Sequence, residues 1–531
     1  GIMQNDTLLA IPFFTLMGII LERSRMAEEL LETVGQVFGA VRGGLAVAVI
    51  LVGALLAATT GVVAAAVISM GLISLPIMLR YGYNRTIATG TITASGTLAQ
   101  AIPPSLVLIV LADQLGRSVG DMYAGGMIPG LMLVGLYLLF IGAVAIVKPD
   151  WVPALPIEAR IYNEPDGSSG HRSLGILMAI CAAAGYAWSQ VHDGIVSPWI
   201  GREMPAAGDE IVILSITVAS FLALGLAIVN RVLKIGLLSR LAEQVTFVLI
   251  PPLVLIFLVL GTIFLGIATP TEGGAMGALG ALIMAGSRGR ITKALMNQAM
   301  ENTTKLAVFV LFILIGSTVF SFTFNAADGH IWVEHLFDGI PGGQMGFLLV
   351  VNTLVFILGM FIDFFEIAFI VVPLLAPVAD KMGIDLIWFG IILAMNLQTS
   401  FLTPPFGFAL FYLRSVAARS DYTDVVTKQR IPAVTTAQIY KGSIAFIVLQ
   451  LIMVGVVIAF PGVVTGSIEK AVTVDETTVN DMLNNMQMDN GEEPAAPEAE
   501  GADKPAEDGM PKPPAEAEED PMKALKDSMK K

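Results

Sequence analysis

Apolar segments separated by short polar stretches run through most of this chain. They lie at residues 8–22, 44–58, 62–79, 86–113, 124–147, 174–191, 211–230, 245–268, 273–286, 304–324, 346–361, 366–379, 386–413 and 443–461. A helix needs about 20 residues to cross the roughly 30 Å hydrocarbon layer of a membrane. Several segments reach that length and several are shorter. The pattern therefore predicts an all-α polytopic membrane protein in which some helices do not cross alone.

Two of the short segments have almost nothing between them. Segments 44–58 and 62–79 are separated only by Thr59, Thr60 and Gly61. We interpret this pair as a re-entrant helical hairpin whose tip stops inside the membrane. Backbone at such a tip is tolerated only where protein or a water-filled cavity satisfies its N–H and C=O groups.

The same arrangement recurs 301 residues later in the chain. Segments 346–361 and 366–379 meet around Asp363 and form the second predicted hairpin. Each hairpin is followed by an apolar segment that a double proline breaks. The residues that match at this spacing are Pro76 and Pro377, Gly82 and Gly383, Pro103 and Pro404, and Pro104 and Pro405. Broken apolar segments at corresponding positions of two halves indicate the binding site of a secondary transporter.

The charges of the loops bear on how the two copies are oriented. Arg80 and Arg85 flank the loop after the first hairpin, whereas Asp380, Lys381 and Asp385 flank the loop after the second. Short loops rich in Lys and Arg favour the cytoplasmic side. The first loop is therefore predicted to be cytoplasmic and the second external, which makes the repeats inverted. The charges disfavour a parallel repeat only mildly, so that alternative stays open.

Composition agrees with a membrane protein. Hydrophobic residues make up 55% of the chain and charged residues 14%, and the mean hydropathy is +0.76, whereas soluble domains have about 25% charged residues. The single cysteine excludes a disulfide framework within the chain, and the four histidines show no metal-ligand spacing. We therefore expect no metal centre and no organic cofactor. The expected surroundings are a lipid bilayer, and no nucleic acid partner is expected.

Four regions follow from these patterns. We expect a first transporter repeat, connecting membrane helices with a polar insertion, a second inverted repeat, and an acidic disordered tail. Their predicted ranges are 1–147, 148–300, 301–461 and 462–531. The tail is rich in Pro, Ala and Glu and has few large apolar residues, so it cannot bury a core. The chain opens on Gly1 close to an apolar segment, so the first repeat is expected to be incomplete at its N-terminus.

The predicted helix breaks suggest a cation site in each half. Where a helix stops inside the membrane, its last carbonyls carry a partial negative charge and its first N–H groups a partial positive charge. Hydroxyl and carbonyl oxygens near such ends suit sodium, as in other transporters with broken helices. The expected sodium ligands are Thr59, Thr60, Gly61, Ser95, Gly96 and Thr97 in the first half, and Asp363, Asn396, Thr399 and Thr403 in the second.

Substrate is expected between the two hairpin tips. The expected substrate-binding residues are Thr60, Gln100, Asp363 and Gln398. Small polar residues in membrane helices also commonly serve close helix packing, which is the alternative for each of them. Asp363 is the strongest candidate because an ionisable group at membrane depth is costly to bury; its alternative is a position near the membrane surface or a structural hydrogen bond to the tip. Glu272 lies among small residues and is expected to be structural.

Five short motifs make the chain resemble one known family. They are IPFFTLMG at 11–18 followed by Glu22-Arg23, IPPS at 102–105, GIATPTE at 266–272, GMFID at 359–363 and TPPFG at 403–407. Together they resemble the large membrane subunit of TRAP transporters, the tripartite ATP-independent periplasmic transporters, from about residue 8 to residue 461. The resemblance implies an elevator-type secondary transporter that couples uptake to sodium in a bacterial inner membrane. It also implies a small four-helix membrane subunit, a periplasmic solute-binding protein and a small organic acid as substrate.

The resemblance places the family's hairpin tips and broken helices on this chain, with two departures. The tips fall on 58–62 and 360–364, and the broken helices on 95–104 and 396–405. The family's serine-rich first tip is replaced by Thr-Thr-Gly-Val, which keeps hydroxyl groups but changes the backbone. The second departure is the bulky run Phe364-Phe365-Glu366 after Asp363, where small residues or proline are common.

Other functional classes are weighed against this one. A one-component sodium/anion symporter with a similar elevator plan is the nearest alternative, and it would transport without a binding protein. An intramembrane enzyme is a remote alternative, because it needs an acid, a base or a nucleophile at a common depth. Asp363 has no Asp, His or Lys partner in another core segment of the sequence, so we expect no enzyme. The mid-membrane breaks argue against a purely structural scaffold.

Overall fold

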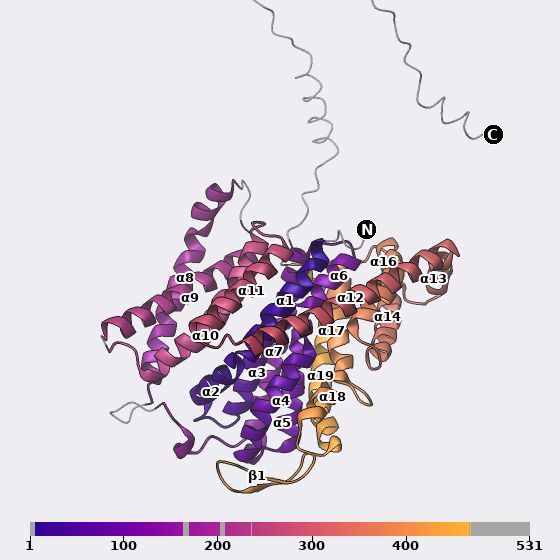
Figure 1. The fold of residues 1–531 in the computed structure, drawn as a ribbon. Helices are drawn as coiled ribbons and strands as arrows, with labels where there is room; N and C mark the ends of the chain where they lie inside the picture. The colour runs from indigo at the N-terminus through magenta and orange to yellow at the C-terminus, as the bar shows by residue number, and fades with distance from the viewer. Residues whose placement is uncertain are drawn as a thin grey trace, which may run out of the picture. The chain divides into compact units, whose positions relative to one another are not determined.

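The computed structural model describes residues 6–162, 169–201, 206, 208–234, 236–466 and 468. The described residues belong to one unit that is almost entirely helical (Figure 1). Most of the predicted acidic tail, from residue 469 onward, lies outside them.

Seven helices among the described residues are long and apolar enough to cross a membrane. They are α4 (Val63–Arg80), α7 (Val119–Val147), α8 (His171–Ile200), α9 (Gly208–Leu233), α10 (Arg240–Phe264), α12 (Lys293–Ala326) and α19 (Thr436–Ala459). Helices α1 (Asp6–Arg23) and α2 (Met26–Phe38) add an eighth span if the 61° bend between them is counted within one crossing. The predicted all-α polytopic protein is confirmed at this level.

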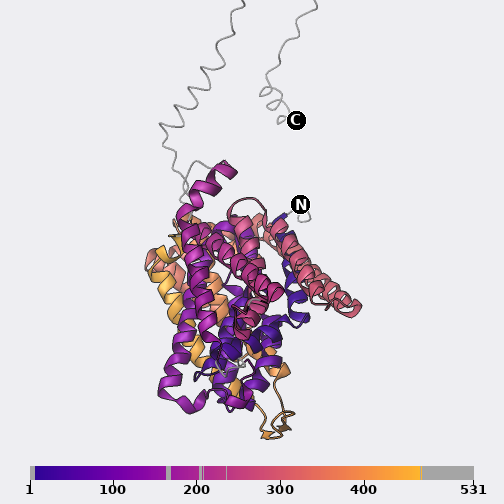
Figure 2. The same ribbon diagram turned by 90° about the vertical axis from the view of Figure 1, so that its left-hand side faces the viewer.

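The remaining elements complete the fold. The helices are α3 (Gly44–Thr60), α5 (Arg85–Thr97), α6 (Leu106–Gln114), α11 (Pro270–Ser287), α13 (Gly329–Asp338), α14 (Gly343–Gly359), α15 (Phe364–Glu366), α16 (Val372–Lys381), α17 (Leu386–Phe401), α18 (Phe408–Val416) and α20 (Gly462–Thr465). Three 3₁₀ turns lie at Leu98–Gln100, Pro149–Trp151 and Ile157–Ala159, and a π-helical turn lies at Ile367–Val371. Strands β1 (Tyr422–Thr423) and β2 (Arg430–Ile431) form an antiparallel ribbon beyond the helix ends (Figure 2).

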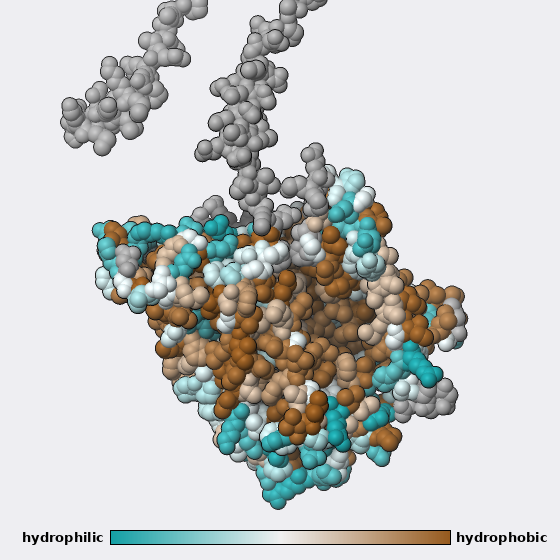
Figure 3. All heavy atoms as spheres, turned by 180° about the vertical axis from the view of Figure 1, so that it is seen from behind, coloured by the Kyte–Doolittle hydropathy of each residue, from teal (hydrophilic) through white to brown (hydrophobic). Residues whose placement is uncertain are grey.

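Hydrophobic side chains cover the outer surface of the helices. Figure 3 shows one face with a broad hydrophobic middle and hydrophilic residues gathered toward its two ends. Large apolar side chains such as Leu139 and Ile146 of α7 and Phe312 of α12 are more than 70% exposed. Exposure of this kind is costly in water and favourable in a bilayer. The surface therefore fits a protein surrounded by lipid.

The two halves of the chain fold in the same register. Helix α5 begins at Arg85 and α17 begins at Leu386, which is 301 residues later. Val62 and Asp363 have the same spacing and are the N-cap residues of α4 and α15. Gly82 and Gly383, which share that spacing, both have positive φ, at 82° and 73°. The spacing seen in the sequence therefore marks equivalent turns and helix starts.

The two broken helices run in opposite directions. Arg80 lies just before α5, and its Nε donates to Asp424, which follows α18, at 3.0 Å. At the other end of the two broken helices, Nη2 of Arg117, which follows α6, lies 3.7 Å from Oδ1 of Asp380, which precedes α17. The start of α5–α6 thus meets the end of α17–α18, and the reverse holds at the far side (Figure 1). Equivalent helices with opposite directions are what an inverted repeat requires.

Helix α19 packs tightly on α5 through two glycines. A Cβ atom added at Gly442 would lie 2.3 Å from the Thr86 carbonyl oxygen, and one added at Gly90 would lie 2.2 Å from the Gly442 carbonyl oxygen. Backbones approach this closely only where both helices have small residues. Nearer its C-terminal end, α19 accepts a hydrogen bond at the Val457 carbonyl from Trp388 Nε1 of α17, at 2.8 Å. Helix α19 therefore holds both broken helices.

Glu272 has the structural role that was expected of it. Its carboxylate accepts from the Thr269 N–H at 2.8 Å, and the Thr269 hydroxyl accepts from the Glu272 N–H at 3.3 Å. This reciprocal pair is a capping box at the start of α11.

Replacing Gly442 by alanine should destabilise the protein, because the added methyl group collides with the α5 backbone. Overpacking of this kind costs about 1–3 kcal/mol. Gly455→Ala is the matched control, since Gly455 lies on the same helix with nothing within 4 Å of an added Cβ. Thermal unfolding in detergent should show a lower melting temperature for Gly442→Ala alone. Equal melting temperatures for the two variants would contradict the close packing.

The Arg80–Asp424 contact should make stability depend on pH. Burial by itself raises the pKa of Asp424, but hydrogen bonds from Thr427 and Arg80 outweigh it and lower the pKa from 3.8 to about 2. A lowered pKa means that the ionised form stabilises the folded state above about pH 4, and that this contribution disappears as the pH falls through about 2. The melting-temperature difference between the wild type and Asp424→Asn should therefore shrink on acidification. A difference that is constant with pH would contradict this.

Candidate functional site

The first hairpin tip rests on the first broken helix. Helices α3 and α4 are joined through Gly61 and Val62, and Gly61 has a φ of +59°. A Cβ atom at Gly61 would lie 3.0 Å from Leu106 Cγ and 3.3 Å from its backbone nitrogen. Glycine is therefore needed at this position both for the left-handed backbone and for the close approach to α6. The predicted tip and the predicted break are brought together.

The second tip lies against its own break in a similar way. The ring centroids of Phe361 and Phe406 lie 6.0 Å apart, and Phe406 belongs to the break between α17 and α18. Asp363 Oδ1 accepts a hydrogen bond from the Phe364 N–H at 2.8 Å and so caps α15. This is the structural hydrogen bond weighed as the alternative for Asp363, and it occupies one carboxylate oxygen. The Pro103–Pro104 and Pro404–Pro405 bonds at the two breaks are both cis.

Hydroxyl groups before the first break point their hydrogens into the helix. The Ser95 hydroxyl donates to the Thr91 carbonyl at 2.6 Å, and the Thr97 hydroxyl donates to the Ala94 carbonyl at 2.9 Å. The Ser95 oxygen then retains two lone pairs for a cation, whereas the Thr97 oxygen, which also accepts from Gln450 Nε2 at 3.3 Å, retains one. Gly96 has a packing reason of its own, because a Cβ atom there would lie 2.3 Å from Val67 Cγ2.

The second break has matching chemistry. The Thr399 hydroxyl donates to the Met395 carbonyl at 2.9 Å, and the Thr403 hydroxyl donates to the Thr399 carbonyl at 2.8 Å. Asn396 Nδ2 donates to the Asn352 carbonyl at 2.7 Å and so ties α17 to α14. The amide donor of Asn396 is therefore committed to a structural contact, whereas the threonine oxygens keep lone pairs.

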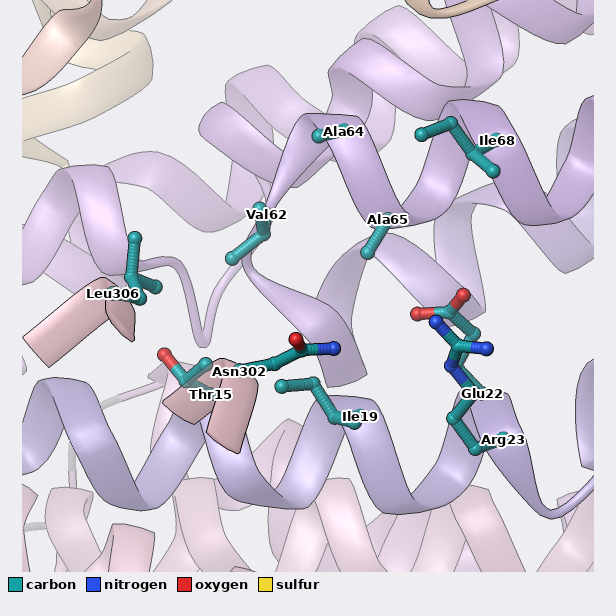
Figure 4. A pocket seen from close by; sticks show the side chains of 10 residues that line it. All are labelled: Thr15, Ile19, Glu22, Arg23, Val62, Ala64, Ala65, Ile68, Asn302 and Leu306. Carbon is teal, nitrogen blue, oxygen red and sulfur yellow. The ribbon is translucent and has the colours of Figure 1, made fainter. Parts of the chain in front are cut away.

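A cavity of about 250 Å³ opens beside the first tip, between α1, α4 and α12 (Figure 4). Its lining residues are Thr15, Ile19, Glu22, Arg23, Val62, Ala64, Ala65, Ile68, Asn302 and Leu306. The Thr15 hydroxyl is buried and has no hydrogen-bond partner in the described part of the chain. The charged side chains of Glu22 and Arg23 extend from α1 toward α4.

Sequence reasoning did not propose the polar residues of this cavity. The available signal was the pair Glu22-Arg23 at the end of an apolar segment, because ionisable groups at such positions are costly and often functional. Asn302 of α12 and Thr15 of α1 had no such signal, since only the packing of the two helices brings them to the first tip.

The predicted substrate residues do not line this cavity together. Gln100 and Gln398 are fully buried elsewhere, and their amide groups find no hydrogen-bond partner among the described residues. Asp363 also lies outside the lining. The side chains of Thr59 and Thr60 lie outside the described part of the structure. The structure thus joins each tip to its own break, while a substrate site shared by both tips stays a prediction.

Comparison with known proteins identifies the family. Residues 1–463 match the family described as tripartite ATP-independent periplasmic transporter, DctM component. The chain is 27% identical over 414 residues to the C4-dicarboxylate TRAP transporter large permease protein DctM of Pseudomonas aeruginosa, which covers 78% of each chain. It is 24% identical over 456 residues to the ectoine TRAP transporter large permease protein TeaC of Halomonas elongata, which covers 86% of this chain and 84% of that protein.

A solved structure is also similar, at a greater distance. The crystal structure of the YdaH transporter of Alcanivorax borkumensis matches with a TM-score of 0.49 and 13% identity, covering 86% of this chain and 85% of that one. A likeness this weak adds nothing to the assignment, which rests on the family match over residues 1–463. The chain belongs to the DctM family of TRAP transporter large permeases, and it is a multi-pass protein of the bacterial inner membrane.

Proposed function

We propose that this chain is the transport subunit of a sodium-coupled importer of a small organic anion, most directly a carboxylate. It receives substrate from a periplasmic binding protein and works with a small four-helix membrane subunit, as a TRAP large permease requires. The observation that carries the proposal is the pair of equivalent broken helices, which run in opposite directions and each lie against a hairpin tip.

The chemistry of the breaks supports sodium as the coupling ion. The α5 and α17 ends present carbonyl oxygens together with the hydroxyls of Thr97, Thr399 and Thr403, and these hydroxyls donate back into their helices. Neutral oxygens suit a hard monovalent cation, and the helix ends add partial negative charge. The ligand set proposed from the sequence is retained for both breaks, with the packing role of Gly96 beside it.

The helices that follow the breaks support an anionic substrate. Helix α6 is capped by Ser105, whose hydroxyl accepts from the Val107 N–H at 3.2 Å. Helix α18 has no side-chain cap at Gly407, so its first N–H groups remain available to an anion. Relatives named for C4-dicarboxylates and sialic acid are consistent with an acid as substrate.

The proposed mechanism is an elevator movement of the two tips and breaks as one body. Helix α19 holds α5 and α17 together, which provides the rigid body that such movement needs. In this proposal the first hairpin enters from the cytoplasmic side, where Arg80 and Arg85 lie, and the second enters from the opposite side. Both hairpins are then re-entrant, and their tips meet substrate near the middle of the membrane.

Uptake should require sodium. Proteoliposomes that contain the large and small subunits, supplied with the binding protein and its substrate, should import substrate in a sodium gradient. Import should cease when potassium replaces sodium, because the oxygen sets at the breaks are proposed to bind sodium and order the tips. Unchanged import in potassium would rule out sodium coupling.

Asp363→Asn should weaken the dependence of uptake on sodium, because it removes the charge but retains an oxygen that can cap α15. Asp385→Asn is the matched control, since Asp385 caps α17 by accepting from the Trp388 N–H at 2.8 Å and lies in the loop before that helix. Thr60→Ala should weaken the sodium dependence of uptake in the same way as Asp363→Asn. The measurement is the sodium concentration that gives half-maximal uptake. Wild-type values for both Asp363→Asn and Thr60→Ala would show that these two residues have structural roles only.

A further inference from the structure

A buried polar cluster connects the two broken helices at the centre of the structure. Gln450 of α19 donates through its Nε2 to the Tyr137 hydroxyl of α7 at 2.6 Å and to the Thr97 hydroxyl of α5 at 3.3 Å. Helix α17 packs on both α7 and α19, and its Gln398 side chain interacts with the Tyr137 hydroxyl without a well-formed hydrogen bond between them. All four residues are fully buried. The cluster therefore reaches from the end of α5 to the end of α17.

In this cluster, each copy of the repeat contributes a side chain that contacts the other copy. Gln450 belongs to the second half of the chain and contacts Thr97, which precedes the break at Pro103. Tyr137 belongs to the first half and lies beside Gln398, which precedes the break at Pro404. Each half thus places a polar side chain against the last helical turn before the break of the other half.

The cluster is not explained by helix packing alone. The close approach of α5 and α19 is already made by Gly90 and Gly442. Both amide atoms of Gln398 and the Oε1 of Gln450 have no hydrogen-bond partner among the described residues. A buried polar atom without a partner costs stability, and an apolar side chain of similar shape avoids that cost. Glutamines at these two positions therefore point to a use beyond stability.

We propose that Tyr137 and Gln450 are positioning residues that couple the two helix breaks, so that sodium at one break favours sodium at the other. This inference rests on the proposed function. Thr97 donates its hydrogen to the Ala94 carbonyl and accepts from Gln450, so its orientation is fixed from both sides. An ion that draws on the Thr97 oxygen shifts Gln450 and Tyr137, and through them the turn that contains Gln398. Coupling of this kind is reciprocal between the two sites.

Tyr137→Phe tests the coupling, because it removes one hydroxyl and keeps the ring. Tyr123→Phe is the matched control, since Tyr123 lies on the same helix, is fully buried, and has a hydroxyl without a partner in the described structure. The measurement is the melting temperature of the purified full chain at increasing sodium concentrations, with potassium replaced in equal amounts. The rise in melting temperature gives the apparent sodium affinity and the Hill coefficient. Tyr137→Phe should lower the apparent sodium affinity about three- to tenfold, the effect of one hydrogen bond, and bring the Hill coefficient toward one.

Gln450→Met provides a second variant, because it keeps the length of the side chain and removes both amide contacts; it should show the same two changes. Tyr123→Phe should match the wild type. Tyr137→Phe and Gln450→Met variants could instead have the apparent sodium affinity and Hill coefficient of the wild type and differ only in a lower melting temperature. That result would overturn the coupling and leave the proposed function intact. A wild-type chain whose melting temperature does not respond to sodium would overturn the proposed function, and the coupling with it.

Discussion

A helix that stops halfway across a bilayer leaves carbonyl and N–H groups that lipid cannot satisfy. This chain has two helix breaks, before Pro103 and before Pro404, which we propose lie inside the membrane, and each is covered by a hairpin tip of the same half. Much of the remaining structure around the stops serves to hold them: α19 packs on both broken helices, and ion pairs tie their outer ends. In the proposed function, these unsatisfied helix ends supply the oxygen atoms that bind sodium.

The two halves share a backbone plan but differ in their polar groups. Val62 and Asp363 occupy equivalent cap positions, yet only Asp363 supplies a charge. Ser105 caps α6, whereas α18 has no side-chain cap at Gly407. These differences favour unequal ion sites around one anion, and the exchanged contacts of Tyr137 and Gln450 offer a physical link between them.

Much of the fold was readable from the sequence, because proline and glycine act locally. The spacing of 301 residues located both breaks, and the structure shows the same spacing between the helix starts at Arg85 and Leu386. The apolar segment 304–324 understated α12, whose polar first turns begin at Lys293. Two features could not be predicted, because the residues that form them meet only when the helices pack. The cavity beside Val62 joins Thr15 to Asn302, more than 280 positions apart. The Gln450–Tyr137 contact joins residues more than 310 positions apart.

The central claim is that the helix breaks hold sodium, and high-resolution cryo-electron microscopy of the complete transporter tests it most directly. Two structures are needed, one in sodium and one with potassium in its place. The account predicts density in sodium at each break, within coordination distance of the helix-end carbonyls and of the hydroxyls of Thr97 and Thr399, and its loss in potassium. Breaks that are empty and identical in both salts, with the tips equally ordered, would contradict the account.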